Sequence, residues 1–347
     1  MPSVTVAAPW RNSSSSCKHF KAMGERERLV WVDLMKAVFI VVVVVFHCAP
    51  HRFYIMSVYP VFFAIAGFLF NSQKYDSFLA FARHRCRQIL VPYLLFGVVF
   101  YALWLGMAWV HVHRTGEAVN YWGPLVEMTT GYPTTILGAY WFANCLLVMQ
   151  LAYWALLRWV PARWHLPITW VLAAVSYYMF YTEFWSLTYV VVFMPFYVFG
   201  VQCKSFLSRQ HLPNGWLRLM ATIVAVAIIW LLDHAMSHWH REVHNLLMLV
   251  LQFGLVAYFF EMAQWLGDII RGSWLARAAT FVSVNALVYL AAQNDVILYL
   301  NMFAHRVLHL SRGWPLTVAI AMTTLLICAA LAWAYNGWMT KVKSRSA

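Results

Sequence analysis

The first long apolar segment of the chain, residues 30–48, limits what the protein can fold into. It contains an unbroken run of five valines, Val41 to Val45, and is long enough to cross a bilayer as a helix. Similar apolar segments follow at about residues 54–72, 89–110, 138–157, 166–181, 186–202, 216–234, 245–263, 279–298 and 315–335. The pattern predicts an all-α, polytopic membrane protein with about ten transmembrane helices.

Composition and charge agree with that fold class. The chain is 63% hydrophobic and 11% charged, whereas soluble domains carry about 25% charged residues. Its net charge of +13 comes mainly from basic residues in short loops between apolar segments, where they act as topology signals. Their distribution places both termini in the cytoplasm and argues against a nucleic-acid partner.

The predicted domain organisation has three parts. Residues 1–27 are polar, lack the apolar core of a signal peptide and are expected to form a disordered cytoplasmic tail. Residues 28–338 form the transmembrane domain. Residues 339–347 form a basic cytoplasmic tail suited to anionic membrane lipid.

The first apolar segment also carries three ionisable residues, Asp33, Lys36 and His47. A charge near the middle of a membrane helix costs about 2.5 to 3.5 kcal/mol, so such residues usually have a function. His47 lies eleven positions after Lys36. At about 100° and 1.5 Å per residue, the two side chains share a helix face about 16 Å apart. The alternative is that Lys36 extends its amine to the interface, or pairs with Asp33 one turn away.

A basic segment with an apolar stripe, residues 78–93, precedes the third apolar segment. It contains Arg83, Arg85 and Arg87. One interpretation is an interfacial helix with its basic side toward lipid headgroups. The other is a phosphate site, because guanidinium groups bind phosphate oxygens in pairs.

These segments together resemble the integral-membrane acyltransferase-3 family. That family has an (Arg or Lys)-x10-His motif in its first helix, matched by Lys36 and His47, often with an aspartate where Asp33 lies. Its second helix reads Pro-x-Phe-Phe-x-x-Ser-Gly, and Ala66 replaces the serine here. The other matching residues are Pro60, Phe62, Phe63, Gly67, the three arginines, Pro92, Tyr93, and Trp141 within Tyr140-Trp141-Phe142. In a late segment that often ends in histidine, this chain has Gln293.

The opening of the chain most resembles the subgroup that contains fucose 4-O-acetylase and exopolysaccharide acetyltransferases. It implies an O-acyltransferase of the bacterial cytoplasmic (inner) membrane that uses acetyl-CoA or another acyl-CoA as donor and a glycan or lipid-linked sugar as acceptor. No cofactor would be bound permanently. The implied catalytic residues are His47, Lys36 and Asp33, with Arg83, Arg85 and Arg87 binding the donor and Phe62, Phe63, Gly67 and Trp141 in support.

The residue chemistry is consistent with this function. Histidine is the natural base for a hydroxyl proton and can pass that proton to a leaving thiolate. Lys36 and the three arginines would meet the phosphates of CoA from the cytoplasm. The extended pantetheine arm would then carry the thioester along the helix toward His47.

Other functions fit parts of the sequence. A transporter or flippase of a small molecule or lipid-linked sugar has the same composition, although neither an inverted repeat nor paired broken helices is evident. The predicted external loop, residues 111–137, is either a sugar-binding segment or a solvated loop. Histidines at 234, 238, 240 and 244 have spacings that metals can use, but no known pattern requires a metal there, and we predict no metal site.

Overall fold

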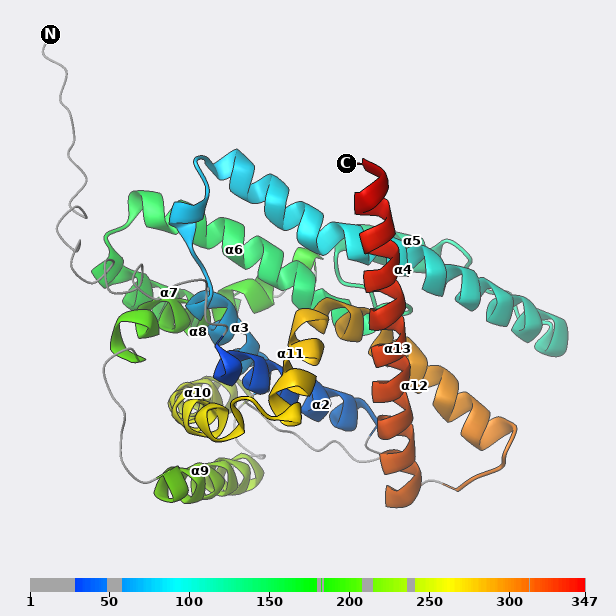
Figure 1. Ribbon diagram of the computed structural model, residues 1–347. Coiled ribbons are helices and arrows are strands. Elements are labelled where there is room, and N and C mark those ends of the chain that lie inside the picture. The colour runs from blue at the N-terminus through cyan, green and yellow to red at the C-terminus, as the bar shows by residue number, and fades with distance from the viewer. Residues whose placement is uncertain are drawn as a thin grey trace, which may run out of the picture.

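The computed structural model describes residues 29–48, 58–179, 182, 184–207, 215–235, 241–311 and 313–346. These residues form helices joined by short connections, without strands, which confirms the all-α prediction (Figure 1). The helices are α2 (Val30–Cys48), α3 (Val58–Phe68), α4 (Phe78–Thr115), α5 (Gly123–Thr130), α6 (Trp141–Trp159), α7 (Ala162–Met179), α8 (Leu187–Leu207), α9 (Gly215–Ala235), α10 (Arg241–Ile270), α11 (Trp274–Val284), α12 (Ala286–Arg306) and α13 (Trp314–Ser346). Three short 3₁₀ helices, η1 (Ser72–Lys74), η2 (Gly138–Tyr140) and η3 (Phe184–Ser186), lie in the connections.

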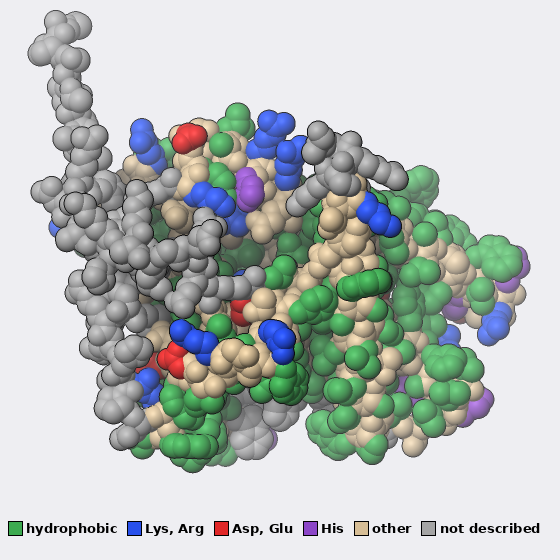
Figure 2. Space-filling view, in the orientation of Figure 1, with side chains coloured by type: hydrophobic (Ala, Val, Ile, Leu, Met, Phe, Trp, Pro, Cys, Tyr) green, Lys and Arg blue, Asp and Glu red, His purple; other side chains and the backbone are tan. Residues whose placement is uncertain are grey.

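Seven of the described helical segments are long and apolar enough to cross a membrane, and three further apolar segments are shorter. Large apolar side chains are exposed around the bundle, among them Leu79, Val98 and Trp333, each at least 70% exposed. In water such a surface would be a liability, whereas lipid covers it without cost. Figure 2 shows hydrophobic side chains over much of one face, with basic side chains in small groups at its upper edge, lower left and right. The protein is therefore a multi-pass membrane protein.

Two apolar segments differ from the helices predicted for them. The basic segment and the third apolar segment form one 38-residue helix, α4, which starts where the Ser77 hydroxyl accepts from the Ala80 amide. The segment at 279–298 is interrupted at Asn285, which divides it between α11 and α12. At the other end of the chain, α13 continues to Ser346, so residues 339–346 are helical. The predicted tail at 1–27 lies outside the described residues.

Helix α2 lies at the centre of the bundle and packs against α3, α10, α11, α12 and α13. The Trp31 ring, near its start, lies 5.0 Å from Phe68 at the end of α3 and 5.6 Å from Phe260 in α10. At the opposite end, Val44 and Cys48 belong to an apolar cluster with Ile297, Ala304, Ile320 and Ala321. Helix α2 is thus enclosed on several sides, while Val38, Val41 and Val45 form its exposed face.

Helices α3 and α8 cross at very short distance. A Cβ atom at Gly67 would overlap the Tyr197 carbonyl, and one at Gly200 would overlap the Ala64 carbonyl. Two backbones can approach this closely only where both helices present glycine. Gly67 of the second-helix motif therefore lies at a helix contact, and α8 is its partner.

Candidate active site

Asp33 is buried at the α2–α11 contact, with 5% of its surface exposed. Ser283 donates its hydroxyl to one carboxylate oxygen at 2.6 Å, and Thr280 donates to the other at 3.0 Å. These bonds compensate in part for burying the carboxylate and fix α2 against α11. Lys36, one turn further along α2, is half-buried.

His47 lies in the last turn of α2 and is half-buried. Its Nδ1 atom lies 2.9 Å from the Val43 carbonyl oxygen. Because a carbonyl oxygen only accepts hydrogen bonds, Nδ1 carries the proton and Nε2 of the neutral ring keeps its lone pair. This is the tautomer that a general base needs.

Helix α2 is uninterrupted from Val30 to Cys48. The regular helical rise therefore applies between Lys36 and His47, and the separation of about 16 Å along one face remains the expected geometry. The structure brings Asp33 together with α11, while Val44 and Cys48, on either side of His47 in sequence, pack against α12 and α13.

The three predicted donor-binding arginines lie in the first turns of α4 but differ in environment. Arg83 and Arg87 are exposed, whereas Arg85 is half-buried. The Arg85 guanidinium lies 5.6 Å from the centre of the Phe81 ring and donates to the Gln88 amide oxygen at 2.9 Å. Its buried Nε has no hydrogen-bond partner in the described part of the chain. Arg85 therefore faces the protein with an unused donor.

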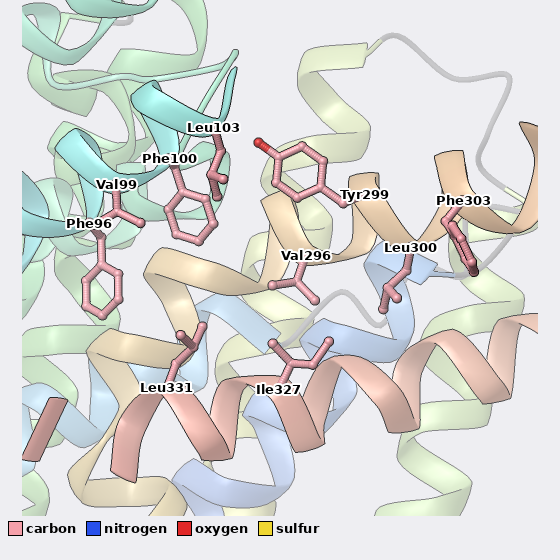
Figure 3. Close-up of a pocket in the computed structure, with 10 residues that line it drawn as sticks. All are labelled: Phe96, Val99, Phe100, Leu103, Val296, Tyr299, Leu300, Phe303, Ile327 and Leu331. Carbon is pink, nitrogen blue, oxygen red and sulfur yellow. The ribbon is translucent and has the colours of Figure 1, made fainter. Parts of the chain in front are cut away.

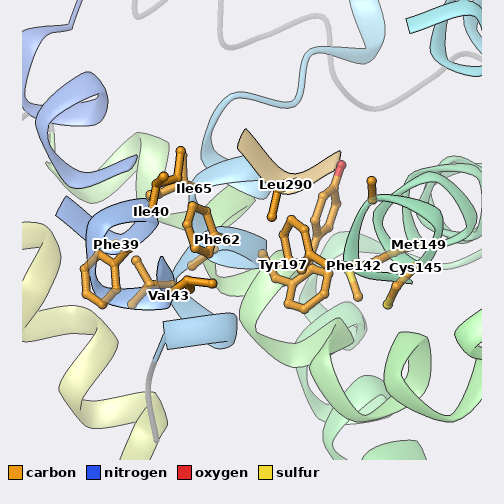
Figure 4. Close-up of a cluster of buried hydrophobic side chains, with 14 of the residues drawn as sticks. Phe39, Ile40, Val43, Phe62, Ile65, Phe142, Cys145, Met149, Tyr197 and Leu290 are labelled. Atoms are coloured by element: carbon orange, nitrogen blue, oxygen red, sulfur yellow. The ribbon is translucent and has the colours of Figure 1, made fainter. Parts of the chain in front are cut away.

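The supporting residues form the packed interior next to α2. Figure 4 shows Phe62 among Ile40, Val43 and Ile65. The Phe63 ring stacks on Phe193 of α8 at 5.0 Å. These aromatic residues fill the space between α2, α6 and α8.

Trp141, the other supporting residue, extends these aromatic contacts at the start of α6, where its ring also lies 6.3 Å from Phe142. Its ring lies 4.8 Å from Tyr189, 5.4 Å from Tyr59 and 6.3 Å from Tyr132. Since α3 starts near Tyr59, this cluster lies toward the same end of the bundle as the start of α3.

The Pro-Tyr pair of the motif has a clear structural role. Pro92 lies inside α4 and removes one backbone donor, which membrane helices tolerate where neighbours supply other bonds. The Tyr93 ring stacks on Tyr140 at 4.8 Å, and its hydroxyl donates to the Met128 carbonyl at 3.0 Å. The Tyr140 hydroxyl donates to the Ile89 carbonyl. The pair therefore ties α4 to α5 and η2.

The predicted external loop is held by acidic side chains. Glu127 accepts from the backbone amides of Thr134 and Thr135 at 2.9 and 2.7 Å. Burial alone would raise the pKa of Glu127, but these hydrogen bonds outweigh it and hold the pKa below its usual value. Further along, the Leu137 amide donates to the Asp295 carboxylate at 3.0 Å. The loop is thus ordered, and it leads directly to Trp141.

Two polar residues of α12 are deeply buried. Gln293 is 1% exposed, and neither its amide oxygen nor its amide nitrogen has a partner within the described residues. Asp295, 3% exposed, was not singled out from the sequence. The signal was present, because Gln293-Asn294-Asp295 interrupts an apolar segment and ionisable residues in membrane helices mark functional sites. His238 and His240, considered above as metal ligands, lie outside the described residues.

The structure also has an apolar groove between α4, α12 and α13. None of the predicted site residues lines it. The groove and the α2 site are therefore separate features of the bundle.

Comparison with known families matches residues 29–335 to the Acyl_transf_3 model, described as an acyltransferase domain. Comparisons with curated proteins and with solved structures gave no match. The family match covers nearly the whole described bundle, including the central helix with Lys36 and His47 and the basic start of α4. The chain therefore belongs to the acyltransferase-3 family and is a membrane acyltransferase.

Proposed function

We propose that the protein transfers an acyl group, in the first instance acetyl, from cytoplasmic acyl-CoA to a hydroxyl of a cell-surface or exopolysaccharide sugar, in the bacterial cytoplasmic membrane. The observation that carries the proposal is the state of His47. Its Nδ1 proton is committed to Val43, which leaves Nε2 as the base. Family membership supplies the reaction class.

In the proposed reaction, Nε2 of His47 accepts the proton of the acceptor hydroxyl. The oxygen of that hydroxyl attacks the carbonyl carbon of the thioester at the same time. The tetrahedral intermediate then collapses, the carbon–sulfur bond breaks and the thiolate of CoA leaves. The proton on Nε2 returns to that sulfur, so the histidine finishes neutral. Asp33 acts as a positioning residue, since its bonds to Thr280 and Ser283 hold the first half of α2 in place.

Among the basic residues, Arg85 is the proposed principal phosphate ligand. Its guanidinium is already oriented by its contact with the Phe81 ring and by its hydrogen bond to Gln88. Arg83 and Arg87 are exposed and would add attraction for the anionic donor without fixed geometry. Lys36, on α2, would also meet the phosphates of the CoA donor.

The test is transfer of radiolabelled acetyl groups from acetyl-CoA in membrane vesicles. We expect His47→Ala to abolish transfer and Lys36→Gln to raise the KM for acyl-CoA more than that for the acceptor. His113→Ala is a matched control, because His113 also bonds through Nδ1 to a backbone carbonyl but is exposed. Transfer that persists in a folded His47→Ala protein would show that another group is the base.

A transporter or flippase remains the second candidate. One observation favours it, since α11 and α12 form a discontinuous helix, a device that transporters use at substrate sites. The break between α11 and α12 is held by a hydrogen bond to α13, however, because Asn336 donates to the side-chain oxygen of Asn285 at 2.9 Å. Flux of substrate without acyl-CoA in the same vesicles would favour transport, whereas label that moves onto the sugar supports the enzyme.

A further inference from the structure

Two polar side chains at the contact between α12 and α13 have no hydrogen-bond partner in the described part of the chain. Gln293 of α12 is 1% exposed, and both its amide oxygen and its amide nitrogen are unpaired. Thr324 of α13 is fully buried, and its hydroxyl is also unpaired. Neither residue lines the apolar groove. Because an unpaired buried polar group costs free energy, two of them at one contact indicate a polar partner other than a side chain.

Both residues lie in the same layer of the bundle. Helices α12 and α13 pack side by side and run in opposite directions (Figure 3). The hydrogen bond between Asn285 and Asn336 joins the two helices at one level. An apolar cluster that contains Ile297 and Ala321 joins them at another level. On each helix, the unpaired residue lies between these two contacts.

The two unpaired side chains are on the helix faces that turn toward α2. Ile297 lies four positions after Gln293 and shares its face of α12. Ala321 lies three positions before Thr324 and shares its face of α13. Both Ile297 and Ala321 belong to the apolar cluster that contains Val44 of α2. The polar groups of the two side chains therefore lie in the interior beside α2.

This level of α2 lies on the proposed path of the acyl-CoA donor. Toward one end of α2, Ser283 of α11 donates to Asp33, and toward the His47 end, Val44 packs against α12 and α13. The two unpaired side chains lie between these levels. A pantetheine arm that runs from Lys36 to His47 passes them.

The pantetheine arm carries groups that match the unpaired atoms. Its amide nearest the thioester lies two carbons from the sulfur, and Gln293 lies about 6 Å before Ile297 along α12, so this amide reaches Gln293 when the thioester lies at His47. The N–H and the carbonyl of a trans amide point to opposite sides. Partners on two facing helices suit that geometry, and a Gln amide and a Thr hydroxyl supply both an acceptor and a donor. The hydrocarbon chain of a lipid has neither group.

We propose that Gln293 and Thr324 bind the pantetheine amide nearest the thioester and so place the thioester carbonyl at His47. The Gln293 oxygen accepts from the N–H of that amide, and the Thr324 hydroxyl donates to its carbonyl. Both are positioning residues. The assignment rests on the acyltransferase function proposed above, and adds to it the groups that hold the donor between its phosphates and its reacting carbon.

The test removes the N–H from the ligand. The first probe is S-ethyl-CoA, a thioether that binds without reacting, and the second is its ester counterpart, with oxygen in place of the N–H nearest the sulfur. Titration calorimetry of purified protein in detergent gives the Kd of each probe for the wild type, Gln293→Leu and Gln150→Leu. Gln150 is the matched control, because it is also buried with an unpaired amide oxygen but lies on α6, which packs against α4 and α8.

We expect the wild type to bind S-ethyl-CoA about tenfold more tightly than the ester probe, and Gln293→Leu to bind the two probes equally. Gln150→Leu should keep the wild-type ratio of the two Kd values. A purely structural effect of Gln293→Leu would weaken both probes and leave that ratio unchanged. An unchanged ratio in Gln293→Leu would therefore overturn the proposal, in favour of an ordered water at this contact.

Thr324→Val tests the other side of the amide. Both probes keep the carbonyl, so this variant should weaken both by a similar factor and retain the wild-type ratio. Unchanged binding of both probes would overturn the contact with Thr324.

The proposed function and the amide contact can fail separately. A wild type that transfers acetyl groups in vesicles but binds the two probes equally would refute the amide contact alone. A wild type that binds neither probe and transfers no acetyl group from acetyl-CoA would instead count against acyl-CoA as the donor.

Discussion

At the level of single residues, Gln293 is the least expected feature of the bundle. Its side chain is almost completely buried, yet both polar atoms lack partners among the residues described. An unsatisfied buried polar group costs about 1 to 3 kcal/mol. Such a group calls for a partner such as a ligand or an ordered water. Gln293 also lies in the segment that resembles the late segment of the acyltransferase-3 family, which often ends in histidine.

The variant Gln293→Leu tests whether Gln293 serves the stability of the fold or the acyl-transfer activity. Removal of the two unpaired polar atoms at nearly constant volume should leave the apparent Tm unchanged or raise it, while acyl transfer falls if the amide contacts substrate. Gln150→Leu is the control, because Gln150 is also buried and has an unpaired amide oxygen. Thermal unfolding in detergent and transfer in vesicles measure the two effects. Full activity of Gln293→Leu would exclude a substrate contact.

The residues of the candidate site that lie close together in sequence were predictable. The Lys36–His47 spacing depends only on the regular rise of one helix, and α2 is continuous over it. The partners of Asp33 were not predictable, because Thr280 and Ser283 lie about 250 residues away in sequence. The inward orientation of Arg85 also depends on the packing of Phe81, which the alternating arginines alone do not indicate.

At the level of helices, the α3–α8 crossing is the contact most sensitive to a single methyl group. Gly67→Ala would place a Cβ against the Tyr197 backbone, which cannot move as a side-chain end can. We expect a loss of about 1 to 3 kcal/mol or more and a clear fall in apparent Tm.

Gly254→Ala provides the comparison. Gly254 is also helical but has no atom within 4 Å of its would-be Cβ, so alanine there should be neutral or slightly stabilising. Thermal unfolding of both variants in the same detergent measures the difference. If the two variants melted together, the close α3–α8 contact would be wrong.

The break between α11 and α12 is a feature that the pattern of apolar residues does not predict. Residues 279–298 form an apolar segment, which predicts one helix, yet the chain ends α11 at Val284 and starts α12 at Ala286. The cause is Asn285, whose amide nitrogen bonds the Phe281 carbonyl while its oxygen accepts from Asn336 of α13. The second bond is tertiary, so local sequence does not reveal it.

At the level of the whole molecule, the directions of the helices and the proposed chemistry together require one orientation of the bundle in the membrane. The start of α2, the end of α3 and the end of α10 meet around Trp31, and the opposite end of α2 meets α12 and α13. Arg85 must face the cytoplasm if it binds acyl-CoA, and the chain from Lys74 to Arg85 must lie on that side. The charge distribution predicts this orientation from sequence alone.

Labelling of single cysteines in intact cells tests that orientation. Lys74 and Ala118 are both exposed and lie beyond opposite ends of α4. A membrane-impermeant thiol reagent should label Ala118→Cys directly and Lys74→Cys only after the membrane is opened, with the wild type as the background for its own cysteines. The reverse pattern would place the arginines outside the cell. Cytoplasmic acyl-CoA could not then reach them, and the donor assignment would fall even though the family and the fold would stand.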